Sequence, residues 1–134
     1  MKHFLHFALA LTLLVAAGVT LSSCGSNVKF VRQDMTEYPP KPANAPIEIH
    51  RGSVLEPHVV IGTMTAEKTI EASFSSESTY DEVLAWLKDQ AREVGADALV
   101  GVSPVNEVGG LNTKLVLTAT AIRYLEPSKT ITSQ

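Results

Sequence analysis

The sequence predicts an α+β fold, a small, mainly antiparallel (split βαβ) sheet of about four strands with one helix packed on one face. Three observations lead to this prediction. Short segments alternate apolar and polar residues, one segment repeats its apolar residues at helical spacing, and the order is strand, strand, helix, strand, strand. A chain of 134 residues has room for one domain.

Two predicted strands precede the helix. Residues 47–50 alternate apolar and polar side chains, as is typical of a half-buried strand. Residues 59–65 are rich in β-branched side chains, and Gly62 within them indicates a bulge or a point of close packing. Arg51-Gly52-Ser53 and Pro57 lie between the two segments and predict a loop.

The helix is predicted to begin at a capping box formed by Thr79 and Glu82, because these side chains can satisfy each other's free backbone N–H groups. Gly95 stands where a glycine commonly ends a helix. Helical spacing places five apolar residues on one stripe, which is expected to face the sheet: Val83, Leu84, Leu87, Ala91 and Val94.

Two further strands are predicted after the helix. Residues 98–102 form a nearly continuous apolar run, typical of a strand buried on both faces. Residues 114–124 alternate, and the face with Leu115, Leu117, Ala119 and Ala121 is expected to meet the helix. The other face, with Thr118, Thr120 and Tyr124, is then solvated or covered by a partner. If the last strand lies between its two predecessors, all neighbouring strands are antiparallel.

Composition excludes several classes of function. The chain has 11 Lys and Arg against 14 Asp and Glu, a net charge of −3, which argues against nucleic-acid binding. Cys24 is the only cysteine, so a disulfide within the chain and a cysteine-based zinc site are excluded.

The first 23 residues are predicted to be a signal peptide. Lys2 gives a positive start, and residues 4–19 are almost wholly apolar but shorter than the roughly 20 residues that a membrane-spanning helix needs. Leu21-Ser22-Ser23-Cys24 follows and resembles the lipobox of bacterial lipoproteins. That resemblance implies cleavage before Cys24, a diacylglycerol on its sulfur, and an acyl chain such as palmitate on the new amino terminus.

The resemblance also implies a location. Lipoproteins with Asp directly after the cysteine tend to stay in the inner membrane, whereas Gly25 stands there in this chain. We therefore expect a lipid anchor in the outer membrane, with the protein facing the periplasm. Residues 24–46 are predicted to be the lipidated cysteine and a proline-rich tether, the alternative being a segment that packs on the domain. Residues 47–125 are the predicted domain and 126–134 a flexible tail.

The domain resembles a recurring bacterial family. Val60-Ile61-Gly62, the segment 91–100 containing Gly95-Ala96-Asp97-Ala98, and the closing segment 118–124 are similar to motifs of the YbjQ-like group and of the Rcs stress-sensor outer-membrane lipoproteins. The resemblance implies a compact α+β domain that binds other proteins or itself. The Rcs sensors use disulfides, which this chain cannot form after Cys24, so their signalling role is not carried over.

Two Glu-x-His pairs are the candidates for metal binding, since carboxylate and imidazole together can hold a divalent ion. They are Glu48 with His50 and Glu56 with His58. The alternative is that these groups are solvated or hydrogen-bonded. Asp97 is interpreted as a structural acceptor in the turn after the helix. We find no catalytic motif and expect neither an enzyme nor a cofactor.

The sequence therefore predicts a lipid-anchored lipoprotein of the cell envelope. Its domain is expected to bind another envelope protein or to self-associate, in a structural or stress-sensing role. The alternative is a periplasmic lipoprotein that binds a metal or small ligand through His50 and His58.

Overall fold

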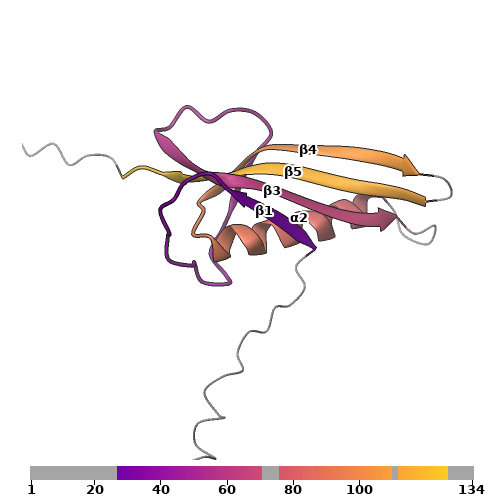
Figure 1. The fold of residues 1–134 in the computed structure, drawn as a ribbon, viewed down its shortest axis with the longest axis horizontal. Helices are drawn as coiled ribbons and strands as arrows, with labels where there is room; N and C mark the ends of the chain where they lie inside the picture. Colours follow the sequence, from indigo (N-terminus) through magenta and orange to yellow (C-terminus); the bar gives the residue numbers. More distant parts are fainter. Residues whose placement is uncertain (1–26, 71–75, 110–111, 127–134) are drawn as a thin grey trace, which may run out of the picture.

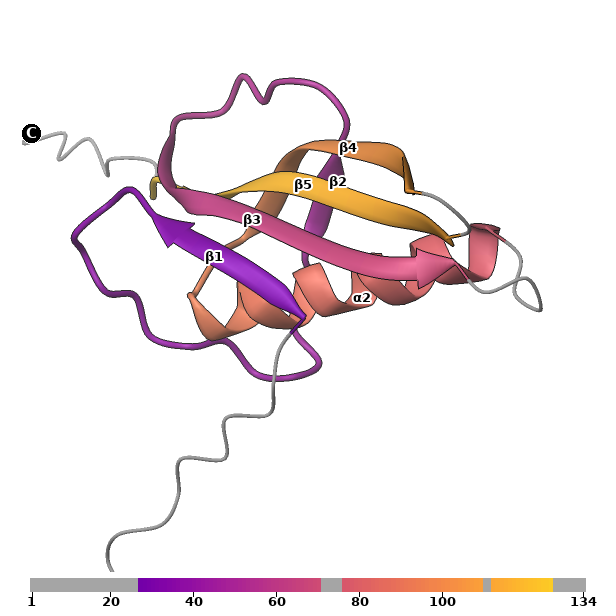
Figure 2. The ribbon, with the colours of Figure 1, turned by 45° about the vertical axis from the view of Figure 1, so that its right-hand side comes forward.

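The computed structural model describes residues 27–70, 76–109 and 112–126. Within them one helix packs on one face of a five-stranded sheet (Figures 1 and 2). The order of the strands in the sheet is β1-β3-β5-β4-β2. The predicted α+β fold, with one helix against a sheet, is confirmed. In chain order the elements are β1 (Val28–Arg32), β2 (Glu48–His50), β3 (His58–Ile70), α2 (Ser76–Glu93), β4 (Ala98–Gly109) and β5 (Asn112–Tyr124).

The topology agrees with the prediction at the centre of the sheet and differs at its edges. The last strand, β5, lies between β3 and β4 and is antiparallel to both, as expected. The prediction that all neighbours are antiparallel is wrong, because β2 joins the far edge beside β4 and runs parallel to it. The count of about four strands is also one short, since β1 was not predicted.

Strand β1 lies in the stretch predicted to be a tether. It pairs with β3 from Val28↔Ala66 to Arg32↔Gly62, and the Val28 side chain is buried. Gly62 makes this approach possible: a Cβ there would lie 2.3 Å from the Val31 carbonyl oxygen. Close packing at Gly62 is thus confirmed. For residues 28–46 the structure shows the alternative, a segment that packs on the domain.

The core lies between α2 and the sheet. The predicted stripe on the helix is buried or half-buried, and the predicted helix-facing side of β5 is buried. The capping box is wrong, because α2 begins at Ser76. Thr79 instead lies one turn before Val83 on the buried stripe, where 2% of its surface is exposed.

Helix α2 ends where the sequence predicts. Gly95 has φ +76°, a conformation that favours glycine, and its N–H donates to the Arg92 carbonyl at 3.1 Å. The Ala96 N–H donates to the Ala91 carbonyl at 2.9 Å. These two bonds form a Schellman motif, which satisfies carbonyls that the helix leaves free and turns the chain into β4.

Strand β4 is longer and less buried than predicted. Ala98 and Leu99 are both buried, so burial on both faces holds at its start. At Gly101, with φ +66°, the pairing with β5 shifts register, and the strand then continues to Gly109 instead of ending at residue 102. Residues 103–108 are exposed.

Candidate functional site

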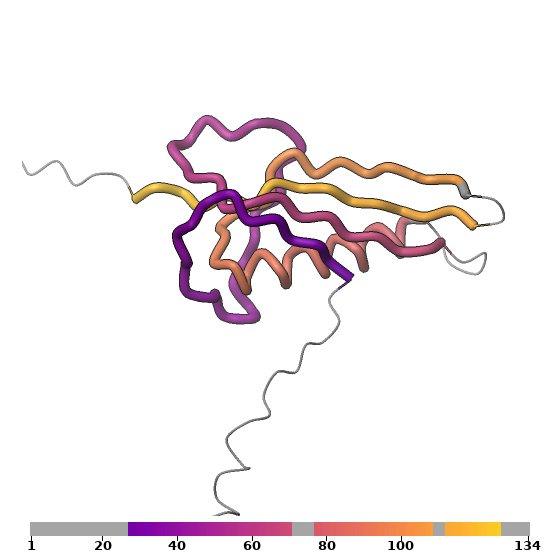
Figure 3. Tube along the Cα trace, viewed as in Figure 1, coloured from indigo at the N-terminus to yellow at the C-terminus, as the bar shows by residue number. Residues whose placement is uncertain are grey.

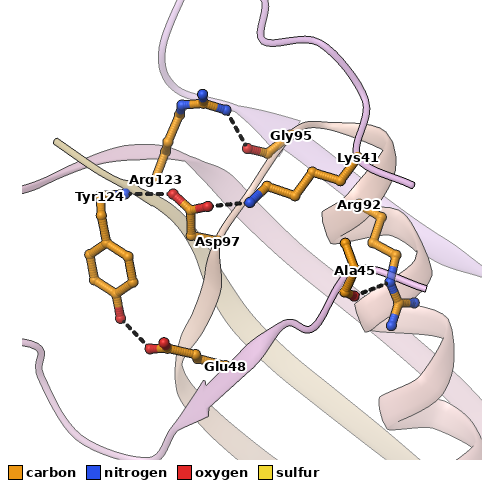
Figure 4. Close-up of polar contacts among 8 residues, drawn as sticks. All are labelled: Lys41, Ala45, Glu48, Arg92, Gly95, Asp97, Arg123 and Tyr124. Atoms are coloured by element: carbon orange, nitrogen blue, oxygen red, sulfur yellow. Dashed lines mark hydrogen bonds and ion pairs between the residues drawn. The ribbon is translucent and has the colours of Figure 1, made fainter. Parts of the chain in front are cut away.

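A polar cluster surrounds Asp97 at the turn between α2 and β4 (Figure 4). Its carboxylate pairs with Lys41 and accepts a 2.9 Å hydrogen bond from the Tyr124 backbone amide. Burial alone raises the pKa of Asp97, but the hydrogen bonds from Lys41 and Tyr124, with nearby positive charge, bring the pKa below its ordinary value. Asp97 thus acts as an acceptor at this turn, as interpreted from the sequence, although its donors come from segments other than the turn.

The same cluster fixes residues 33–47, which we call the N-terminal strap, against the C-terminal end of α2. The Lys41 amide donates to the Arg92 carbonyl at 2.8 Å, and Arg92 Nε donates to the Ala45 carbonyl at 2.8 Å. The Arg123 guanidinium lies 5.0 Å from the centre of the Tyr38 ring. The strap carries the chain from β1 past the helix end to β2 at the opposite edge of the sheet (Figure 2).

The two Glu-x-His pairs have different surroundings. His50 Nε2 lies 3.0 Å from Glu48 Oε2, and the Tyr124 hydroxyl donates to the same carboxylate oxygen at 2.6 Å. His58 Nδ1 instead lies 2.7 Å from the backbone carbonyl of Glu56, whose carboxylate takes no part in that contact. Within residues 27–70, 76–109 and 112–126, no group of three or more His, Cys, Asp or Glu could hold a metal ion.

The contact between Glu48 and Tyr124 changes the acidity of both groups. The hydrogen bond from Tyr124, followed by that from His50, lowers the pKa of Glu48. The hydrogen bond to Glu48 raises the pKa of Tyr124 to about 12. An ionised Glu48 and a neutral Tyr124 are therefore the stable forms at neutral pH.

The free edge of β4 is the most distinctive surface of the described domain. Strand β2 pairs only with residues 98–100. Residues 103–109 pair with β5 on one side and, among the described residues, with no strand on the other. Figure 3 shows this arm of β3, β5 and β4 extending beyond the start of β1. Val105 and Val108 on it are 49% and 80% exposed.

Sequence reasoning missed this edge because Pro104 interrupts the strand pattern. A proline removes a ladder donor and is confined to edge strands, strand starts or bulges. The proline was therefore the signal that could have indicated an edge strand continuing past residue 102.

The sheet face opposite α2 carries paired threonines. Thr63 faces Thr120, and Thr65 faces Thr118, across the β3–β5 ladder. All four are half-buried, whereas Ile122 farther along the same face of β5 is fully buried. The predicted solvated or partner-covered face is thus only partly open.

Other predicted features lie outside the described residues. Cys24, the whole of the signal peptide and residues 127–134 are among them. In the part of the chain that the structure describes, no helix has the length and apolar character required to cross a bilayer.

Neither a family model nor a curated protein matches the chain. Solved structures that share the fold include the following two. One is a protein of unknown function of the DUF74 family from Pediococcus pentosaceus, with 16% identity, 59% of this chain and 98% of that chain covered, and a TM-score of 0.52. The other is the Francisella virulence factor FvfA, with 12% identity, 70% of this chain and 95% of that chain covered, and a TM-score of 0.55. At these identities the likeness shows the fold alone.

Proposed function

We propose that this protein is a lipid-anchored lipoprotein of the bacterial cell envelope, held in the outer membrane through Cys24 and facing the periplasm. Its α+β domain binds another protein through the free edge of β4. Neither a cofactor nor a catalytic step is part of this proposal.

The position of the first strand supports the anchor. Strand β1 begins at Val28, four residues after Cys24. Cleavage before Cys24 therefore leaves every described element of the domain in the mature protein. The two or more acyl chains implied by the lipobox resemblance would hold the protein stably, because each buried CH₂ contributes about 0.8 kcal/mol.

The unpaired length of β4 is the observation that carries the proposed binding. Strand edges present free N–H and C=O groups, which can pair with an extended segment of another chain. Exposed Val105 and Val108 add apolar contact area on this edge. Glu107 faces Lys114 across the ladder, but Lys114 pairs with Glu67 at 3.2 Å, so Glu107 leaves a negative charge on this edge.

Substitutions on the edge test the proposal. Val105→Lys and Val108→Lys should each weaken partner binding by about tenfold or more, since burying a valine contributes about 1.5–3 kcal/mol. Val31→Lys on β1 is the matched control, because Val31 is also an exposed valine, at 52%, but lies across the sheet. Photo-cross-linking from Asn106 in intact cells measures binding. Equal adduct yields in all three variants and the native protein would refute binding at this edge.

Metal or small-ligand binding is less well supported. Glu48 and His50 do lie together, but Tyr124 already occupies the carboxylate oxygen nearest His50. The described residues supply no third ligand of the kind that a zinc site requires.

A further inference from the structure

We infer that the free edge of β4 receives an extended segment of a protein embedded in, or attached to, the same membrane. This inference rests on the proposed lipid anchor at Cys24. It names the kind of partner and where that partner must present its segment.

The chain between the anchor and the domain is too short to serve as a spacer. Cys24 and Val28 are four residues apart, and a fully extended chain spans at most about 3.6 Å per residue, so their Cα atoms lie within about 14 Å. The N-terminal strap adds no reach, because it follows β1 and is bound to the helix end. The domain is therefore held beside the bilayer surface.

The register of the sheet relates the free edge to this short connection. Val28 pairs with Ala66, Ala66 with Leu117, and Leu117 with Pro104, so these residues form one row across four strands. Three strand spacings of about 4.8 Å place Pro104 roughly 14 Å from Val28. The start of the free edge thus lies within about 30 Å of the anchored cysteine.

The edge is only partly protected against strand addition. Residues 103–109 contain no Lys or Arg; Pro104, which blocks one backbone bond, and Glu107, whose charge is costly to cover, are the residues among them that oppose it. A proline on an edge strand turns its nitrogen away from the ladder, here toward the open side. Because the backbone groups of every second residue point to the same side of a strand, the N–H and C=O groups of Asn106 and Val108 point to the open side as well. An incoming segment would meet these groups beside two exposed valines.

Several registers in which a second copy of the chain could pair with this edge are unfavourable. In antiparallel self-pairing centred on Val105 or Asn106, Pro104 leaves a partner carbonyl without a donor, and the two-fold symmetry repeats the defect. Centring on Glu107 places two carboxylates opposite each other, which is destabilising. A different polypeptide meets each obstacle only once. A partner confined to the same membrane also meets the edge at high effective concentration.

Lengthening the connection tests the inference in the full, lipidated protein. A flexible Gly-Ser insert of about 20 residues between Ser26 and Asn27 makes the connection sixfold longer, which should reduce the cross-link from Asn106 about 15-fold. The same insert after Glu126 is the control and should leave the cross-link unchanged. Mass spectrometry of the adduct should identify a protein of the same membrane.

Several outcomes would overturn the inference. An adduct yield insensitive to the N-terminal insert, an adduct with a soluble protein, or an adduct between two copies of this chain would each do so. The lipid on Cys24 is measured in the same samples. If Cys24 carries no lipid, the proposed function fails; if it does and the insert has no effect, only the inference about the partner fails.

Discussion

Replacing Gly62 with alanine tests whether β1 belongs to the folded domain. Gly62 lies on β3 opposite Arg32, at the end of the β1–β3 ladder. An added Cβ would lie 2.3 Å from the Val31 carbonyl oxygen and 2.5 Å from Phe30 Cε2. Real Cβ contacts are never this short, so one of the two strands must move.

The cost follows from the two ways in which the domain can respond. If β1 stays in place, the overpacked contact costs about 1–3 kcal/mol. If β1 detaches, Val28 becomes exposed, and loss of a fully buried valine costs about 1.5–3 kcal/mol. Either response predicts a fall of about 2 kcal/mol in the free energy of unfolding of Gly62→Ala.

Urea unfolding of the chain beginning at Gly25 measures this fall, and tryptic cleavage after Lys29 or Arg32 reports whether β1 has detached. Gly52→Ala is the control, because a Cβ there meets no atom within 4 Å. It should change stability by no more than about 0.5 kcal/mol. If Gly62→Ala is as stable as this control and equally resistant to trypsin, the packing of β1 described above is incorrect.

Three further predictions concern the polar cluster around Asp97, the contact between Glu48 and Tyr124, and the register shift in β4. Asp97→Asn should cost about 1–3 kcal/mol at neutral pH. Because folding lowers the pKa of Asp97, its stabilising contribution is fully present above the ordinary carboxyl pKa of 3.8 and is lost as the pH falls through the lowered pKa. In urea unfolding, the stability of the Asn variant should therefore vary less with pH below about pH 5. Glu48→Gln should return the pKa of Tyr124 from about 12 toward 10.0, as measured by tyrosinate absorbance. Because folding raises this pKa, the contribution of Tyr124 to the stability of the fold is fully present below pH 10.0 and is lost as the pH rises through about 12. Gly101→Ala meets no atom within 4 Å but has φ +66°, so it should cost about 1–2 kcal/mol in urea unfolding. An unchanged pH profile, an unchanged tyrosine pKa or an unchanged stability would contradict the respective prediction.

Local signals predicted the central part of the fold. The helical spacing of Val83, Leu87 and Ala91 identified the buried stripe, and Gly95 marked the helix end. The alternation along β5 identified which face meets the helix. These features depend on residues within one or two turns, or on the period of a single strand, and so can be read from the sequence.

The edges of the sheet depend on distant contacts. Strand β1 has five residues, and its place in the sheet depends on Gly62, which lies far along the chain. The parallel pairing of β2 with β4 depends on the path of the N-terminal strap, which Arg92 and Asp97 fix. Thr79 fits the sequence pattern of a capping residue. In the structure it lies within α2, where its side chain is buried on the same stripe as Val83.

The candidate site was predicted in part. Glu48 and His50 were predicted as a candidate pair, and His50 Nε2 does lie 3.0 Å from Glu48 Oε2. The part played by Tyr124 required the parallel placement of β2, which no local pattern gives. The free edge of β4 was missed because Pro104 makes a continuing strand look like a loop.

The mass of the N-terminal peptide of the protein isolated from its own membranes tests the central claim most directly. The peptide should begin at Cys24 and carry a diacylglycerol on sulfur and an acyl chain on its amino group, and Cys24→Ala should abolish both cleavage at that point and retention by the membrane. An unmodified Cys24, or an alanine variant cut at the same residue and still found in the membrane fraction, would contradict a protein fastened by lipid.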